Sequence, residues 1–132
     1  RLSQGKEAPS IMTWGRYNRK ALVRIPIVPT DESGRPTSPE TIEFRLPDGS
    51  AHPHLLLAGV AQALVDGRAA ADLETLIERT ALTAQGTATM ENRVPLTFVE
   101  IADALEVSRP AFEAGGVFAP TMLNRVVGIL RD

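Results

Sequence analysis

The stretch TIEFRL, residues 41–46, alternates polar and apolar side chains along its whole length. Successive side chains of a β-strand point to opposite faces, so this pattern predicts a strand with Ile42 and Phe44 on one face. Glu43 and Arg45 then lie together on the other face. Such a strand packs its apolar face against a core and presents an acid and a base on the opposite side.

A second strand is predicted upstream, in the stretch ALVRIPIV at residues 21–28. Val23, Ile25 and Ile27 recur at every second position, which places Arg24 on the opposite face. Residues 29–39 contain three prolines and one glycine, and this composition indicates a turn or a longer excursion between the two strands. A further short strand is predicted at residues 11–14.

The remainder of the chain shows helical patterns. From Pro53 the sequence is apolar almost all round, so a helix there, ending near Asp66 and Gly67, is expected to be buried on most of its surface. Further helices are predicted at 70–84, after the Thr97–Glu100 capping box, at 110–114 and at 120–130.

These patterns predict an α+β fold. We expect antiparallel strands and loops in residues 1–50, covered by the mainly helical residues 51–132. A chain of 132 residues buries roughly two-thirds of its unfolded surface, which suffices for one core. We therefore predict a single unit over residues 1–132. Because the sequence does not begin with Met, we also expect it to be a segment of a longer polypeptide.

Composition excludes several classes of site and location. The chain has no cysteine and two histidines, so it cannot by itself form a disulfide framework, a zinc ribbon or a three-histidine metal site. The longest apolar run, residues 55–61, is far shorter than the roughly 20 residues that a membrane-spanning helix needs. We therefore expect no membrane association, and no secretory leader is recognisable at the start.

Charge is distributed unevenly along the chain. Residues 1–24 hold six basic residues and one acidic residue, a net charge of +5, whereas the other residues hold eight basic and fifteen acidic, a net charge of −7. A basic segment of this kind is suited to phosphates, anionic substrates or nucleic acid. Nucleic-acid binding also needs aromatic side chains between the basic ones, and Tyr17 alone does not provide them, so we predict no nucleic-acid partner.

Several residues in these segments could carry chemistry. Guanidinium groups bind phosphate oxygens bidentately, so Arg19 and Arg24 are candidates for anion binding, although solvated surface arginines explain them equally well. Glu43 with Arg45 could pair a metal ligand with an anion clamp, or could be an ordinary ion pair. Glu7 lies in a loop bounded by glycine and proline, where it is either a mobile catalytic acid or a solvated one.

The motif His52-Pro53-His54 offers two imidazoles in a row of three residues. Two histidines without a third ligand make a weak metal site, so capping of the predicted helix or an interface role is the simpler interpretation. From the residues alone, the chain is an arginine-bearing sheet with helices, and its ligand is an anion.

The order of the motifs resembles the C-terminal part of the catalytic domain of glutamine synthetase, type I. The resemblance rests on RLSQGKEAP at 1–9, NRKALVRIP at 18–26, IEFRLPD at 42–48, the apolar helix that ends in DG at 66–67, and GGVF at 115–118. It covers nearly the whole chain. It implies a ligase that uses ATP and Mg²⁺ or Mn²⁺ to join ammonia to glutamate through a γ-glutamyl phosphate. The implied assembly is a cytoplasmic homo-oligomeric ring, a dodecamer.

The resemblance also implies roles for individual residues. Glu7 matches the catalytic flap glutamate, and Arg1 matches an arginine that holds the substrate carboxylate. Arg19 and Arg24 match the pair that contacts the ATP phosphates, Arg19 also acting on the phosphoryl group in transfer. Glu43 matches a metal-ligating glutamate, and Arg45 matches an arginine beside the glutamyl phosphate that binds substrate glutamate.

Three departures from the family pattern concern the amine acceptor. Thr41 stands where bacterial members often have a nucleotide-contacting arginine, and His52 and His54 flank the proline where Asn and Tyr are usual. The segment after Gly67 has no tyrosine, so no adenylylation site is predicted. Relatives of this architecture attach polyamines or other amines to glutamate, and some are not catalytic. Since further metal ligands of the family lie outside this sequence, we expect the isolated chain to be an inactive fragment.

Overall fold

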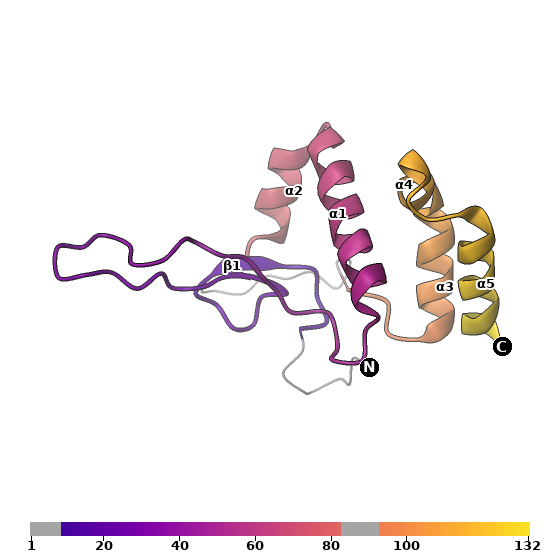
Figure 1. The fold of residues 1–132 in the computed structure, drawn as a ribbon, viewed down its shortest axis with the longest axis horizontal. Coiled ribbons are helices and arrows are strands. Elements are labelled where there is room, and N and C mark those ends of the chain that lie inside the picture. Colours follow the sequence, from indigo (N-terminus) through magenta and orange to yellow (C-terminus); the bar gives the residue numbers. More distant parts are fainter. Residues whose placement is uncertain (1–8, 83–92) are drawn as a thin grey trace. The chain divides into compact units, whose positions relative to one another are not determined.

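The computed structural model describes residues 9–82 and 93–132, whose helices and strands are drawn in Figure 1. The chain divides into two compact units. One unit comprises residues 1–47 and 74–94, and the other comprises residues 48–73 and 95–132. The first holds the sheet with helix α2 (Leu73–Thr80), and the second holds the other described α-helices. The single domain expected over residues 1–132 stays a prediction.

The sheet of the first unit is mixed. Strands β1 (Trp14–Arg16) and β2 (Val23–Ile25) are parallel, and β3 (Glu43–Phe44) is antiparallel to β2, giving the order β1-β2-β3. The expected antiparallel sheet is therefore wrong for the β1–β2 pair. Side-chain alternation reports which face a residue occupies and carries no information about strand direction. The α+β class is confirmed.

Residues 17–22 form the short connection between the parallel strands β1 and β2. Tyr17 adopts a left-handed φ of 59°, and the Ala21 amide donates to the Asn18 carbonyl at 3.2 Å. Gly15 faces this turn closely, since a Cβ there would lie 3.3 Å from the Cβ of Asn18. Ala21 and the adjacent Leu22 are buried in the core of the unit.

Helix α2 is tied to the sheet through Trp14. The indole N–H donates to the carbonyl of Ile77 at 2.8 Å, and the Leu82 amide donates to the Trp14 carbonyl at 2.8 Å. The sequence predicted a longer helix, residues 70–84, but α2 spans Leu73–Thr80. Trp14 therefore anchors the end of α2 with its polar atom as well as by packing.

The strands are shorter than predicted, and their apolar face is not buried. Ile42 is 71% exposed and Phe44 is 41% exposed, although the pattern predicted that both would pack on a core. β3 is an edge strand of two residues, and no described segment buries Ile42 or Phe44. Ile27 falls outside β2 and is also exposed.

In the second unit, the helix bounds follow the predicted starts closely. The helices are α1 (Pro53–Ala69), α3 (Phe98–Val107), α4 (Arg109–Glu113), the 3-10 turn η2 (Ala114–Gly116) and α5 (Pro120–Arg131). The predicted capping box is present: Thr97 accepts from the Glu100 amide, and the Glu100 carboxylate accepts from the Thr97 amide. At η2, Gly115 and Gly116 both take positive φ, which ends the helical segment as predicted.

The core of this unit lies between α3 and α5, which pack side by side (Figure 1). Ala102 is fully buried, and Leu123 and Val127 of α5 are nearly so. Arg131 adds ion pairs at 2.7 Å to Asp103 and to Glu106 of α3. α1 contacts α4 through a polar tie, described below.

The expected burial of α1 is wrong for the described chain. Among its residues only Gln62 is buried, whereas Leu57, Leu64 and Val65 are 67%, 65% and 63% exposed. The Gln62 side-chain amide donates to the carbonyl of Ala111 at 2.6 Å and to another carbonyl beyond α4. An apolar helix is buried only where other chain covers it, and within this unit the contact of Gln62 with the α4 segment marks a covered side of α1. The helix also continues past Gly67 to Ala69.

Candidate functional site

The candidate site begins with a cross-strand pair. Arg24, at the middle of β2, lies directly opposite Glu43, the first residue of β3, in the antiparallel register. Directly opposed residues share one face and have adjacent side chains. The Arg24 guanidinium contacts Oε2 of Glu43 through both Nε and Nη2, so that the two residues form a charge-assisted hydrogen-bonded pair.

Arg45, the residue that follows β3, joins the pair. Its Nε lies 3.6 Å from Oε1 of Glu43, so the carboxylate is shared between two guanidinium groups. The side chains of Arg24 and Arg45 are 23% and 17% exposed, and that of Glu43 is 40% exposed. The acid and base that alternation placed on one face are therefore brought together, and Arg24 is added to them by the register.

Arg45 also links this face to the turn that carries Arg19. Its Nη1 donates to the carbonyl of Arg19 and, at 3.2 Å, to the carbonyl of Ala21. The Arg45 amide donates to the Leu22 carbonyl at 3.0 Å. The backbone of Arg19 is thus fixed beside the cluster, while its side chain is exposed. The spacing of residues in the sequence could not predict this contact, because the contact depends on how β3 pairs with β2.

Two predicted site residues, Arg1 and Glu7, lie outside the described residues. Of the rest, Arg24, Glu43 and Arg45 form one cluster, hereafter the Arg24–Glu43–Arg45 cluster, and Arg19 contributes its backbone to it. This is the convergence of basic and acidic groups that the candidate site requires. The individual roles of these residues remain predictions.

The cluster offers one ligand to a divalent cation. Hard cations prefer carboxylate oxygen, and Mg²⁺ is commonly held by one or two carboxylates together with water and substrate phosphates. The partly exposed carboxylate of Glu43 fits that pattern. Across residues 9–82 and 93–132, no group of three or more His, Cys, Asp or Glu side chains could hold a metal ion.

The two histidines lie close to each other. The rings of His52 and His54 lie with centroids 5.6 Å apart, and both residues are exposed at the start of α1. His52 occupies the N-cap position, but its side chain makes no capping hydrogen bond. Proline at the first helical position starts the helix instead. Both residues lie in the second unit, apart in sequence from the cluster of the first.

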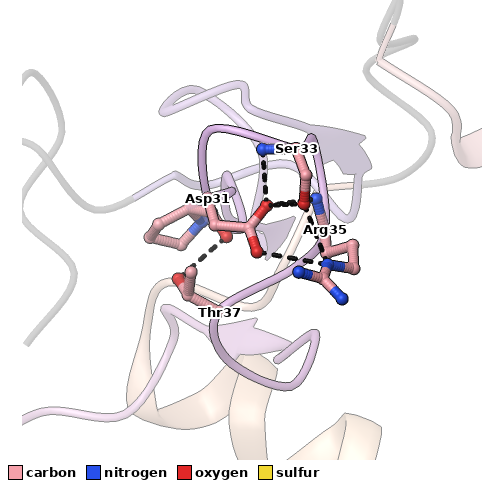
Figure 2. A network of polar contacts seen from close by, with 5 residues as sticks. Asp31, Ser33, Arg35 and Thr37 are labelled. Carbon is pink, nitrogen blue, oxygen red and sulfur yellow. Dashed lines mark hydrogen bonds and ion pairs between the residues drawn. The ribbon is translucent and has the colours of Figure 1, made fainter.

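The long excursion between β2 and β3 is internally ordered, as Figure 2 shows. Oδ1 of Asp31 accepts hydrogen bonds from the amides of Ser33 and Arg35 and from the Ser33 hydroxyl, while Thr37 donates to the Pro29 carbonyl. The Ser33 hydroxyl, followed by the Arg35 amide, lowers the pKa of Asp31 below its ordinary value. The sequence predicted an excursion but gave no signal for this network.

The base of the excursion carries a second ion pair. Arg16, at the end of β1, contacts Glu40 at 2.7 Å, and both side chains are more than half exposed. The hydrogen bond that Arg16 donates to the Glu40 carboxylate raises the pKa of Arg16. An exposed pair of this kind contributes little to stability, but it joins the end of the excursion to the end of β1.

The second unit contains an apolar cavity of about 310 Å³ bounded by α3, α4 and α5. Its lining includes Ile101, Leu105, Phe112 and Leu130, with Ser108 as a polar group. This lining lacks the charged side chains that phosphate or amino-acid substrates need.

Among the described residues, no helix is both long enough and apolar enough to cross a membrane.

Comparison with known proteins decides the family. The family model described as "Glutamine synthetase, catalytic domain" matches residues 1–129. The chain belongs to the glutamine synthetase catalytic-domain family. It is 31% identical over 126 residues to a glutamine synthetase of Streptomyces filamentosus, an alignment that covers 94% of this chain and 26% of that protein.

Other glutamine synthetases match over different lengths. That of Salmonella typhimurium is 29% identical over 145 aligned positions, covering 100% of this chain and 27% of the relative. That of Helicobacter pylori is 45% identical over 67 residues, covering 51% of this chain and 13% of the relative. The chain thus spans about a quarter of the length of the relatives that match it throughout. The glutamine synthetase resemblance seen in the sequence is confirmed.

Proposed function

We propose that this chain supplies the arginine- and glutamate-bearing part of a glutamine synthetase site that joins ammonia to glutamate at the expense of ATP. The single observation that carries the proposal is the Arg24–Glu43–Arg45 cluster, within a chain that matches the family over residues 1–129. Phosphoryl transfer is catalysed mainly by positioning and by neutralising negative charge. Guanidinium groups beside a metal-ligating carboxylate suit that task.

The proposed reaction has two steps. A γ-carboxylate oxygen of glutamate attacks the terminal phosphorus of ATP, the bond to the bridging oxygen breaks, and ADP leaves with that electron pair. Bound ammonium first loses one proton, for which Glu7 is the proposed acceptor. The ammonia so formed attacks the γ-carbon of the acyl phosphate, phosphate leaves with its electron pair, and the amide nitrogen then loses a second proton to solvent or to the departing phosphate.

The remaining residues also have proposed roles. Arg19 and Arg24 bind the phosphates of ATP, with Arg19 also stabilising the charge of the transferring group. Glu43 binds Mg²⁺ or Mn²⁺, which when present neutralises phosphate charge. Arg45 and Arg1 hold the glutamate. The network around Arg45 keeps its guanidinium fixed against the backbone of Arg19 before substrate arrives, which reduces the ordering cost of binding.

The proposed context is the one that the family resemblance implies. We propose a homo-oligomeric ring, a dodecamer, working in the cytoplasm, where ATP is available. The isolated 132-residue chain is proposed to be inactive, because its described residues provide a single carboxylate of a metal site. The alternative function, attachment of another amine or a polyamine to glutamate, is favoured by Thr41, His52 and His54, which depart from the family pattern. A non-catalytic relative is the other alternative.

The test is phosphate release by the natural polypeptide that carries this chain, with glutamate, ATP and Mg²⁺. Ammonium, methylamine and a polyamine are supplied in turn, and the preferred amine identifies the reaction. Glu43→Gln should lower kcat at least about 100-fold, whereas the matched control Glu40→Gln, in an exposed ion pair, should change it less than about twofold. Equal activity of the Glu43→Gln protein, or turnover by the isolated chain, would refute the proposal.

A further inference from the structure

Arg19 is held in a different way from the other described arginines of the candidate site. Arg24 and Arg45 contact the Glu43 carboxylate through their side chains, and both side chains are mostly buried. The Arg19 side chain is exposed, and the hydrogen bond described for this residue is accepted by its carbonyl, from Nη1 of Arg45. The position of Arg19 before a ligand binds therefore depends on the main chain of the turn that carries it.

Residues 18–21 form that turn, with Arg19 and Lys20 at its centre. The Ala21 amide donates to the Asn18 carbonyl at 3.2 Å, which closes the turn. The Asn18 side chain adds a second closure, because the Lys20 amide donates to Oδ1 of Asn18 at 2.9 Å. An asparagine side chain that accepts from the amide two residues on favours a turn locally. The main chain of Arg19 is thus enclosed by two hydrogen-bonded rings, and one of them depends on the Asn18 side chain.

Contacts from β1 and from the residue after β3 restrict the same turn. Gly15 of β1 has no Cβ, and a Cβ there would lie 3.3 Å from the Cβ of Asn18 and 3.5 Å from that of Ala21. Arg45 donates from Nη1 to the carbonyls of Arg19 and Ala21. Asn18 is half-buried and Ala21 is buried, whereas Arg19 is exposed. The turn therefore has a fixed base and presents Arg19 at its exposed tip.

We propose that Asn18 is a positioning residue for Arg19 in nucleotide binding, an inference that rests on the phosphate-binding role proposed above for Arg19. An exposed arginine loses rotamer freedom when its guanidinium binds phosphate. Binding would also have to order the main chain of Arg19 if the turn were not already formed. The Asn18 side chain removes that part of the ordering cost, and it acts on the nucleotide only through Arg19.

The predicted effect of Asn18→Ala is selective for one substrate. The variant removes the acceptor of the Lys20 amide, and a hydrogen bond of this kind changes an equilibrium by a factor of about three to ten. The KM for ATP should therefore rise about three- to tenfold. The KM for glutamate should stay within about twofold, because the proposed glutamate-binding residues are Arg1 and Arg45. Loss of stability alone would lower the active fraction, and hence kcat, and would leave both KM values unchanged.

The experiment uses the natural polypeptide that carries this chain. Both KM values are measured, and the affinity for the non-hydrolysable analogue β,γ-methylene-ATP with Mg²⁺ is measured by isothermal titration calorimetry. Unfolded protein lowers the stoichiometry in calorimetry and leaves the affinity unchanged, so the affinity reports on positioning. Asn18→Ser keeps a shorter acceptor that supports the same turn more weakly, and its affinity should fall between those of Asn18→Ala and the unsubstituted protein.

Two controls match the substitution. Oδ1 of Asp31 accepts from the Ser33 amide at 2.9 Å, the same turn contact in the excursion between β2 and β3. Asp31→Ala removes that contact from the same unit, and Asn124→Ala removes an exposed asparagine from α5. Each control should change the analogue affinity less than about twofold.

The outcomes separate this inference from the proposed function. Weaker analogue binding by Asn18→Ala with an unchanged KM for glutamate supports the inference. An unchanged analogue affinity, or an equal rise of both KM values, overturns it. If the unsubstituted protein binds the analogue but uses no amine, the proposed ligase function fails while the analogue affinities still decide the role of Asn18. If the unsubstituted protein does not bind the analogue, both proposals fail.

Discussion

Removal of the Arg45 guanidinium should destabilise the first unit by about 2 kcal/mol. The side chain is 17% exposed, and its Nη1 donates to two main-chain carbonyls of the turn before β2. Hydrogen bonds from a charged donor contribute about 1.5–3 kcal/mol each, and a part-buried carbonyl left without its donor costs a similar amount. Because one of these carbonyls, that of Arg19, lies in an exposed turn and regains water, we take about 2 kcal/mol for Arg45→Met.

The assay is equilibrium unfolding in urea, followed by far-ultraviolet circular dichroism and by Trp14 fluorescence, which reports on the first unit. With a slope of about 2 kcal/mol per molar urea, Arg45→Met should lower the midpoint by about 1 M. Arg45→Lys keeps a donor without the planar fork and should lose about half as much. Arg79→Met, at an exposed position of α2, serves as the control and should stay within about 0.5 kcal/mol.

Hydrogen exchange locates the effect. If Arg45 holds the turn, Arg45→Met should speed up hydrogen exchange of the Ala21 and Leu22 amides, relative to the unsubstituted chain, more than it speeds up exchange of amides in the second unit. The reasoning would be refuted if Arg45→Met unfolded at the same urea concentration as Arg79→Met. It would also be refuted if exchange accelerated equally in both units.

Three other outcomes follow from the structure. Gln62→Met keeps the side-chain volume but removes the donor to the Ala111 carbonyl, so it should destabilise the second unit by about 1–3 kcal/mol. Urea unfolding measures the loss, and the exposed Leu57→Ala serves as the control. Thr97→Ala should lower the free energy of unfolding by about 1 kcal/mol, because the capping box is lost. Thermal unfolding measures this change, and Thr97→Ser should retain most of the stability. The folded-state pKa of Asp31 is lowered, so its hydrogen bonds stabilise the excursion above the unfolded pKa and are lost as pH falls through the folded pKa. The amide shift of Ser33 should therefore titrate at a lower pH than that of an aspartate in an unstructured peptide, and titration at the ordinary pH of an aspartate would contradict the network.

Local patterns in the sequence were enough for the elements whose signals are local. The capping box at Thr97 and Glu100, proline at the start of α1 and the Gly115–Gly116 stop each concern groups within one helical turn. Such signals act through main-chain hydrogen bonds and allowed φ values, which neighbouring residues decide. Family membership was likewise readable, because the order of motifs spans nearly the whole chain.

Burial was not predictable in the same way. Leu57 and Ile42 are apolar and were expected in a core, yet both are exposed in the described chain. Removing an apolar side chain from water is favourable in free energy, but burial requires other segments of the chain to cover that side chain. A chain that spans about a quarter of its relatives' length has fewer segments available for that purpose.

The sequence by itself determined the residue types of the site and the face that Glu43 and Arg45 share, because alternation along one strand is a local property. Only the tertiary structure decided that Arg24 lies opposite Glu43 and that Arg45 reaches the carbonyl of Arg19. Both contacts depend on the direction and register with which separate strands pair. A shift of one residue in that pairing would send each side chain to the other face and leave the charges apart.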